Sequence, residues 1–187
     1  DEIYQTALAT DNNLTISGGL KKLPYRVSFG YTNQNGVLRT DNLQRTSIAL
    51  VLNPSFFNNH LKVDLNIKGS AQQTRFANTG AIGGAISFDP TQPVYDPNSP
   101  FDGFFEFTNG PSVNDFAPIA VANPVAQLLQ TNNRSVNRKL FGNFEIDYKF
   151  HFLPELRWVT NLGYDRDSGF SRNFSPATAR TSPIRQN

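Results

Sequence analysis

The chain has 187 residues, a formal charge of +2, 38% hydrophobic residues and no cysteine. This composition excludes a disulfide framework, thiol catalysis and cysteine metal sites. The basic residues stand singly along the sequence, without a basic helix or stripe, so nucleic-acid binding is not supported. No run of about 18 apolar residues predicts a transmembrane helix, and no basic start with an apolar core predicts a signal peptide within these residues.

Six segments show the apolar-polar alternation, with a period of two, that predicts strands with one apolar and one polar face. In chain order they span residues 13–19, 24–32, 46–53, 61–70, 139–150 and 156–165. The fourth segment alternates without interruption from Leu61 to Lys68. The predicted fold class is therefore all-β, with antiparallel up-and-down strands.

The connections between these strands alternate in length. Residues 19–23, 53–60 and 151–155 form short connections, whereas residues 33–45 form a longer one and residues 71–138 a very long one. Outer-membrane barrels show this rhythm, with short turns on the periplasmic side and long loops outside. The mean hydropathy of -0.42 agrees with a barrel, because only every second strand residue would face lipid.

The two faces of the predicted strands carry different chemistry. Aromatic residues at or near strand ends on the apolar face are predicted to lie at the lipid interface: Tyr25, Tyr31, Phe150, Trp158 and Tyr164. Polar residues on the opposite face are predicted to face the barrel lumen: Lys62, Asp64, Asn66, Lys68, Glu145, Asp147 and Lys149. The strands thus predict part of a transmembrane β-barrel in contact with outer-membrane lipid.

The connection at residues 71–138 is too long for a passive loop in a compact domain. A proline-rich stretch precedes a cluster of aromatic residues, Phe101, Phe104, Phe105 and Phe107. The cluster has three interpretations: packing inside the loop, contact with a partner protein, or stacking on a substrate. For sugar stacking, Tyr95 is the better candidate.

A short helix is expected near the end of this loop, with Asn123 as its N-cap and Pro124 at its first position. Three glycines, Gly80, Gly83 and Gly84, precede no phosphate-loop sequence and open no clear helix. Neither feature predicts a nucleotide site.

The carboxylate and histidine residues do not show the sequence pattern of a catalytic or metal site. Glu145 and Asp147 lie about 7 Å apart on one side of a strand, a spacing that would suit a glycosidase pair. The alternative interpretation is a pair of solvated lumen charges, balanced by neighbouring lysines. His60 and His151 lie at short turns without the neighbouring ligands that zinc or a catalytic triad needs.

Three loop aspartates, Asp89, Asp96 and Asp102, could bind calcium, but they lack the spacing of a dedicated calcium loop. No enzyme activity, cofactor or metal is therefore expected.

Four stretches, taken in their order and spacing, resemble the SusC/RagA-type TonB-dependent transporters of the Bacteroidetes outer membrane. They are Asp1-Glu2-Ile3-Tyr4 leading into Asn13-Leu14-Thr15-Ile16-Ser17-Gly18-Gly19, Tyr25-Arg26-Val27-Ser28-Phe29-Gly30-Tyr31, Leu52-Asn53-Pro54-Ser55-Phe56-Phe57, and Phe88-Asp89-Pro90-Thr91-Gln92-Pro93-Val94-Tyr95. None of the four is a catalytic motif.

The resemblance implies a barrel of 22 strands that is closed by a plug domain and covered by a SusD-like surface lipoprotein. Such a transporter imports glycans or oligopeptides, and TonB, acting through parts absent from this chain, supplies the force. Six strands are too few to close a barrel. We therefore expect residues 1–187 to be a partial barrel domain of a larger transporter, without its plug and remaining strands.

Two other function classes remain open at this stage. A soluble all-β binding or adhesion module would hide the apolar strand faces in a sandwich core, so it would not need detergent. A hydrolase would use Glu145 and Asp147, and replacing both residues would then abolish its activity.

Overall fold

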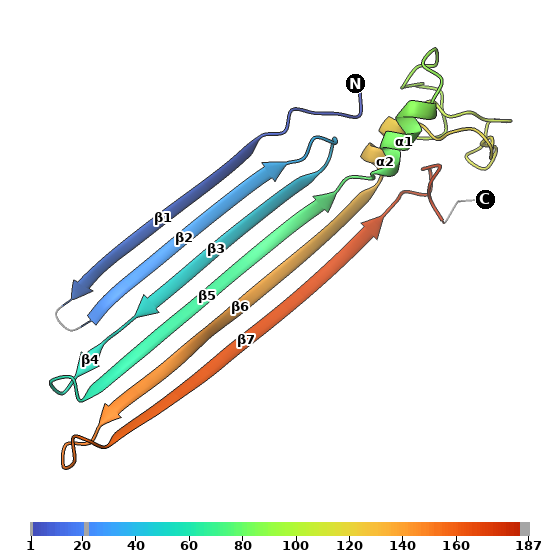
Figure 1. Cartoon of the computed structure of the whole chain (residues 1–187). Coiled ribbons are helices and arrows are strands. Elements are labelled where there is room, and N and C mark those ends of the chain that lie inside the picture. Colours follow the sequence, from blue (N-terminus) through green and yellow to red (C-terminus); the bar gives the residue numbers. More distant parts are fainter. Residues whose placement is uncertain (1, 21–22, 184–187) are drawn as a thin grey trace.

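The computed structural model describes residues 2–20 and 23–183. These residues form one large sheet, and a small group of loops and helices extends from one end of it (Figure 1). The elements in chain order are β1 (Ala9–Leu20), β2 (Leu23–Asn35), β3 (Asn42–Leu52), β4 (Ser55–Phe56), β5 (Leu61–Phe76), α1 (Gly80–Ser87), α2 (Pro124–Gln130), β6 (Asn132–Lys149) and β7 (Arg157–Phe174). Within the described ranges, neither helix has the length and hydropathy needed to cross a membrane.

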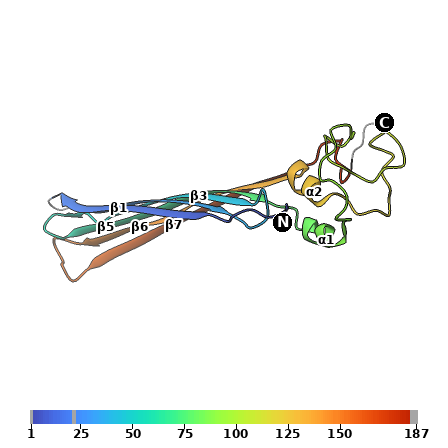
Figure 2. The same cartoon turned by 90° about the horizontal axis from the view of Figure 1, so that it is seen from above.

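The sheet has seven strands in the order β1-β2-β3-β5-β6-β7, with β4 paired to β5, and all pairs are antiparallel. Each of the six predicted strands is therefore confirmed, and the all-β, up-and-down fold class with them. The two-residue β4 was not predicted, because two residues are too few to show a period. Seen from above, the sheet is a single layer (Figure 2).

The strands extend further toward the long loop than their sequence pattern predicts. β5, β6 and β7 have 16, 18 and 18 residues, whereas about 9–11 residues suffice to cross a bilayer. In the added part, both faces carry polar residues, as in Gln72-Gln73-Thr74-Arg75. Alternation disappears there, but the pairing with the neighbouring strand continues to Phe76. The connection between β2 and β3 consequently shrinks to residues 36–41, and the long loop to residues 77–131.

The register places the apolar positions of neighbouring strands side by side. Tyr25 lies opposite Leu52, which lies opposite Leu65. Leu65 in turn lies opposite Phe144, and Phe144 opposite Leu162. These rows form a continuous apolar face, on which Leu162 remains 61% exposed. Such an exposed apolar face is what the sequence analysis expects of a transmembrane β-barrel wall in contact with lipid.

The buried core lies at the loop end of the sheet. It joins Ile3 and Leu38, which come from the N-terminal segment and the β2–β3 connection, to Ala81 of α1 and to Val125 and Leu128 of α2. Within the described residues, no second sheet covers the apolar face, as the sandwich alternative would require. The described residues therefore do not form the sandwich core of that alternative.

The helix α1 corrects the expectation that the glycines around Gly80 open no helix. Its N-cap, Thr79, makes no side-chain capping bond, and its glycines have low helix propensity. Gly84 is buried, and a Cβ placed on it would lie 3.5 Å from the Pro124 side chain. The small residue permits close contact with α2, so tertiary packing stabilises this helix where propensity does not.

Candidate functional site

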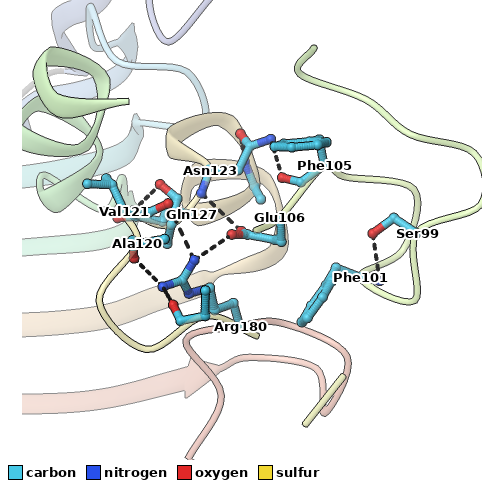
Figure 3. Close-up of polar contacts among 12 residues, drawn as sticks. Ser99, Phe101, Phe105, Glu106, Ala120, Val121, Asn123, Gln127 and Arg180 are labelled. Carbon is cyan, nitrogen blue, oxygen red and sulfur yellow. Dashed lines mark hydrogen bonds and ion pairs between the residues drawn. The ribbon is translucent and has the colours of Figure 1, made fainter. Parts of the chain in front are cut away.

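The long loop, residues 77–131, is folded around Asn123. This side chain is 1% exposed and caps α2, as the sequence predicts: its Oδ1 accepts hydrogen bonds from the N–H groups of Val125 (3.0 Å) and Ala126 (3.2 Å). Its Nδ2 donates to the carbonyls of Val94 (2.7 Å) and Phe105 (3.0 Å). One residue therefore ties the helix to two segments of the loop, at Val94 and at Phe105. Figure 3 shows the contact with Phe105.

A buried ion pair fastens the segment after β7 to this loop. Arg180 donates to the Glu106 carboxylate at 3.1 Å, and the two side chains are 7% and 1% exposed. Arg180 also donates to the carbonyls of Ala117 (2.8 Å), Ala120 and Val121 (3.3 Å). Figure 3 shows Arg180 beside Glu106, Ala120 and Val121. The barrel strand β7 is thus connected to the loop that precedes β6.

The electrostatics of the pair are dominated by burial. Burial raises the pKa of Glu106, while the N–H of Asn123 (3.0 Å) and the Arg180 guanidinium each oppose that rise. Because buried charges are costly unless they are paired, the pair holds the loop in one arrangement. The sequence analysis did not find the pair, although Glu106 is the single charged residue in the Phe-rich stretch 103–108.

The structure divides the aromatic cluster. Phe101 and Phe104 are buried, at 1% and 9% exposed, so they pack inside the loop and offer little surface to another molecule. Phe105 and Phe107 are half-buried and pack edge to face, with ring centroids 5.2 Å apart. Tyr95 is 52% exposed, and its ring centroid lies 5.4 Å from that of Phe104. Of the predicted contact residues, Tyr95 thus has the most exposed ring, and Phe104 packs against that ring.

Two of the loop aspartates, Asp89 and Asp96, stabilise local turns, and the third, Asp102, contacts the segment after β7. Asp89 accepts hydrogen bonds from the N–H and hydroxyl of Thr91, at 2.9 and 2.7 Å, which lower its pKa. Asp96 caps the N–H of Asn98 at 3.0 Å, and Asp102 accepts from the Thr178 hydroxyl at 2.5 Å. Across the described residues, no group of three or more His, Cys, Asp or Glu side chains is placed to hold a metal ion.

The polar residues predicted to face the lumen share one face of the sheet. Lys62 lies opposite Asp147, and Asp64 lies opposite Glu145. The side chains of Asn66, Lys68 and Lys149 alternate along the strands in phase with these four, so they lie on the same face. Both carboxylates of the proposed hydrolase pair are engaged: Asp147 pairs with Arg157, and Glu145 accepts from Asn161 at 3.0 Å. These partners support the interpretation as wall charges.

The predicted interface aromatics lie on the apolar face or at its turn end. Tyr25 and Tyr31 are on β2, and Trp158 and Tyr164 are on β7, with Trp158 opposite Tyr148. Phe150 lies just beyond β6 and packs on Tyr148, with ring centroids 5.2 Å apart.

The turn end of the sheet also brings the two histidines together. The rings of His60 and His151 stack with centroids 4.1 Å apart. The Nδ1 of His60 lies 3.1 Å from the carbonyl of Lys149, and the Nδ1 of His151 lies 3.0 Å from the Tyr148 hydroxyl. The structure therefore places both histidines at the short turns, as the sequence analysis expects.

Comparison with known proteins supplies the family. No family model matches the chain. It is 42% identical to the TonB-dependent receptor SusC of Bacteroides thetaiotaomicron over 180 residues, which make up 90% of this chain. The chain belongs to the SusC-like TonB-dependent receptors. This SusC-like chain is also similar to two receptors of Formosa agariphila, TonB-dependent receptor P26 (24% identity over 83% of the chain) and TonB-dependent receptor P3 (27% over 95%).

The SusC-like chain spans 18%, 14% and 17% of the lengths of these three relatives. Membership in the family places it in the outer membrane of a Gram-negative bacterium. The relatives are named as receptors and not as enzymes. The general pattern of outer-membrane barrels would place the short turns of the sheet on the periplasmic side and the long loop at the cell exterior.

Proposed function

We propose that this chain forms part of the barrel wall and extracellular rim of an energy-coupled importer for glycans or oligopeptides. The supporting observation is the 42% identity to SusC. The matched chain folds into a sheet with an exposed apolar face and a folded loop at one end. The proposed partners are a SusD-like surface lipoprotein at the rim and TonB, which would act through other parts of the receptor, including a plug. The chain itself would carry out no chemistry on the substrate.

The geometry of the loop supports a binding role for Tyr95. The aromatic ring is supported from below by Phe104, and a backbone bridge joins the two residues. Aromatic rings offer a large contact area at a low entropic cost, and the tyrosine hydroxyl adds a polar contact. A ring held in this way could stack on a sugar or on a peptide side chain as it enters the mouth.

Replacing Tyr95 by alanine should weaken substrate capture without preventing assembly. In cells that carry the full-length receptor, we expect the substrate concentration for half-maximal uptake to rise about three- to tenfold, because an aromatic contact contributes about 0.5–1.5 kcal/mol beyond its buried area. Uptake of labelled glycan fragments and labelled oligopeptides measures this, and Tyr95→Phe is the matched control. Unchanged half-saturation in Tyr95→Ala for both substrate classes, at equal surface abundance, would refute the role.

Exposed isoleucines on the same loop support a protein partner. Ile82 and Ile86 lie one turn apart on α1 and are 39% and 82% exposed. Clustered apolar side chains on a polar surface mark interaction sites. Because the helix is docked through its opposite side, at Ala81 and Gly84, the exposed side is held in place for a partner.

The double variant Ile82→Ser with Ile86→Ser should release the lipoprotein. Burial of an isoleucine contributes about 1.5–3 kcal/mol, so we expect the amount of lipoprotein that co-purifies with the receptor to fall at least about tenfold. The control is Ala85→Ser on the exposed surface of the same helix. Equal recovery of lipoprotein with the double variant and the control would remove α1 from the interface.

A further inference from the structure

Five arginines lie together on the lipid-side face of the sheet, beyond the end of its apolar band. They occupy the same parity of strand positions as the apolar residues of β5, β6 and β7, and they are Arg75, Arg134, Arg138, Arg166 and Arg172. The pairing aligns three of them in one row: Arg75 lies opposite Arg134, and Arg134 lies opposite Arg172. We call this set the arginine patch.

The arginine patch corrects the expectation that the basic residues form no stripe. In the sequence, Arg75 is separated from the others by the entire long loop, and the remaining four stand singly on two strands. The register of β5, β6 and β7 brings them onto one face. The acidic residues Asp165 and Asp167 occupy the alternate positions of β7, so they lie on the opposite face.

The patch carries positive charge that the described residues do not neutralise. Among these residues, none of the five arginines has a carboxylate partner within 4.0 Å. Arg134 donates its Nε–H to the Asn132 amide oxygen at 2.9 Å, and the Arg172 guanidinium lies 5.9 Å from the Phe174 ring centroid. Like charges placed directly opposite across strands are destabilising. An external anion would remove that cost.

The patch borders a polar hollow. A depression of about 340 Å³ lies at its β3 side and is lined by Arg75 and Arg134 together with mostly neutral polar side chains and one carboxylate, that of Asp41. The Nε of Arg75 is buried and has no hydrogen-bond partner among the described residues. Two guanidinium groups, one of which has an unused Nε donor, therefore border a site large enough for a phosphate-sized group.

The position of the patch along the strands indicates which kind of anion it could bind. On β7 the continuous apolar run of this face ends at Tyr164, and Arg166 follows at the next position of the same parity. Beyond it the face is mixed, because Phe170 and Phe174 are interspersed with the arginines. Strands of 16 and 18 residues continue well past the length that spans hydrocarbon, so the patch reaches the headgroup layer and beyond. Arginine binds phosphate through paired, charge-assisted hydrogen bonds.

We propose that the arginine patch binds the phosphate groups of a phosphorylated glycolipid in the outer leaflet around the barrel. The inference depends on the barrel segment and its outer-membrane location, and not on which substrate is imported. Bound lipid would screen the arginine row and hold the extended strands upright above the membrane. The patch would thereby support the wall that carries the long loop.

The test uses full-length receptor in nanodiscs that contain phosphorylated outer-membrane glycolipid, or the same glycolipid with its phosphates removed. The variant is Arg134→Gln with Arg172→Gln, and the matched control is Arg26→Gln with Arg45→Gln, which removes two arginines from the opposite face of the sheet. Lipid retained after detergent extraction is quantified by native mass spectrometry. Substrate uptake is measured separately in cells, so that failure of the import proposal is distinguished from failure of this one.

We expect the wild type and the control to retain phosphorylated glycolipid. The arginine variant should bind it at least about tenfold more weakly, because each charge-assisted hydrogen bond that is lost weakens the binding of the phosphate. Dephosphorylated glycolipid should show no difference between variant and control. Equal retention of phosphorylated lipid by variant and control would overturn the proposal. Equal retention of both lipids by the wild type would also overturn it.

Discussion

Replacing Arg180 by methionine should release the long loop from the end of the sheet. Methionine keeps most of the length of the side chain but leaves the Glu106 carboxylate buried without its cation. Removing one partner of a buried ion pair costs about 3–5 kcal/mol. We expect hydrogen exchange in peptides covering residues 88–130 of the intact receptor to accelerate by orders of magnitude at neutral pH.

The pH dependence of this variant gives a second readout. Burial raises the pKa of Glu106, and loss of Arg180 removes one of the groups that oppose the rise. A carboxyl group whose pKa is raised on docking contributes stability that is fully present below its ordinary value of about 4.3 and is lost as the pH increases through the shifted pKa. Protection of the loop in Arg180→Met should therefore recover on acidification, whereas at neutral pH adding Glu106→Gln should restore part of it.

Arg39→Met is the matched control for this experiment. Arg39 also pairs with a glutamate, Glu2, but at 3.9 Å and with side chains 33% and 69% exposed. An exposed pair of this kind contributes about 0–1 kcal/mol, so its loss should leave the exchange of the loop almost unchanged. If Arg180→Met and Arg39→Met behaved alike, the buried pair would not be what holds the loop.

An arginine at Leu65 should impair assembly of the receptor in the outer membrane. Leu65 lies in the apolar row between Leu52 and Phe144, so its side chain faces the middle of the lipid band. A charged arginine at the bilayer midplane of a barrel costs about 2–4 kcal/mol. We expect a lower urea midpoint for the purified receptor and a smaller fraction of folded, heat-modifiable protein in outer-membrane preparations.

Asn66→Arg is the control for this substitution, because Asn66 is the next residue on β5 and its side chain points to the polar face. The same charge on this face should cost much less, since it remains in contact with water and with acidic neighbours such as Asp64. Equal losses from Leu65→Arg and Asn66→Arg would contradict the assignment of the two faces. Detergent dependence provides an independent check, because the exposed apolar face requires it.

The strand β7 connects the lipid-facing part of the sheet with the arginine patch and with the buried Glu106–Arg180 pair. β7 passes from the lipid band at Tyr164, through the patch at Arg166 and Arg172, to the segment that carries Arg180. A single strand thus connects the membrane surface to the loop that bears Tyr95. β7 pairs with β6 over its whole length, from Arg157 to Phe174.

The sequence by itself determined the features that depend on local pattern. A period of two is visible in any short stretch that has one apolar and one polar face, so all six long strands and their lipid side could be predicted. The Asn123-Pro124 pair predicted α2 because an N-cap and a first-turn proline are local signals. The resemblance to the SusC/RagA family likewise came from short stretches in order, and the comparison with SusC confirmed it.

Only the tertiary structure decided the features that depend on pairing across long sequence distances. The outer halves of β5, β6 and β7 have no alternation and are strands because their neighbours pair with them. The helix α1 forms from a glycine-rich segment because α2 packs against it. Glu106 and Arg180 are 74 positions apart, and the five arginines are brought together by register alone. Residue types along a chain do not reveal such neighbours, because the register of distant strands is set by the whole sheet.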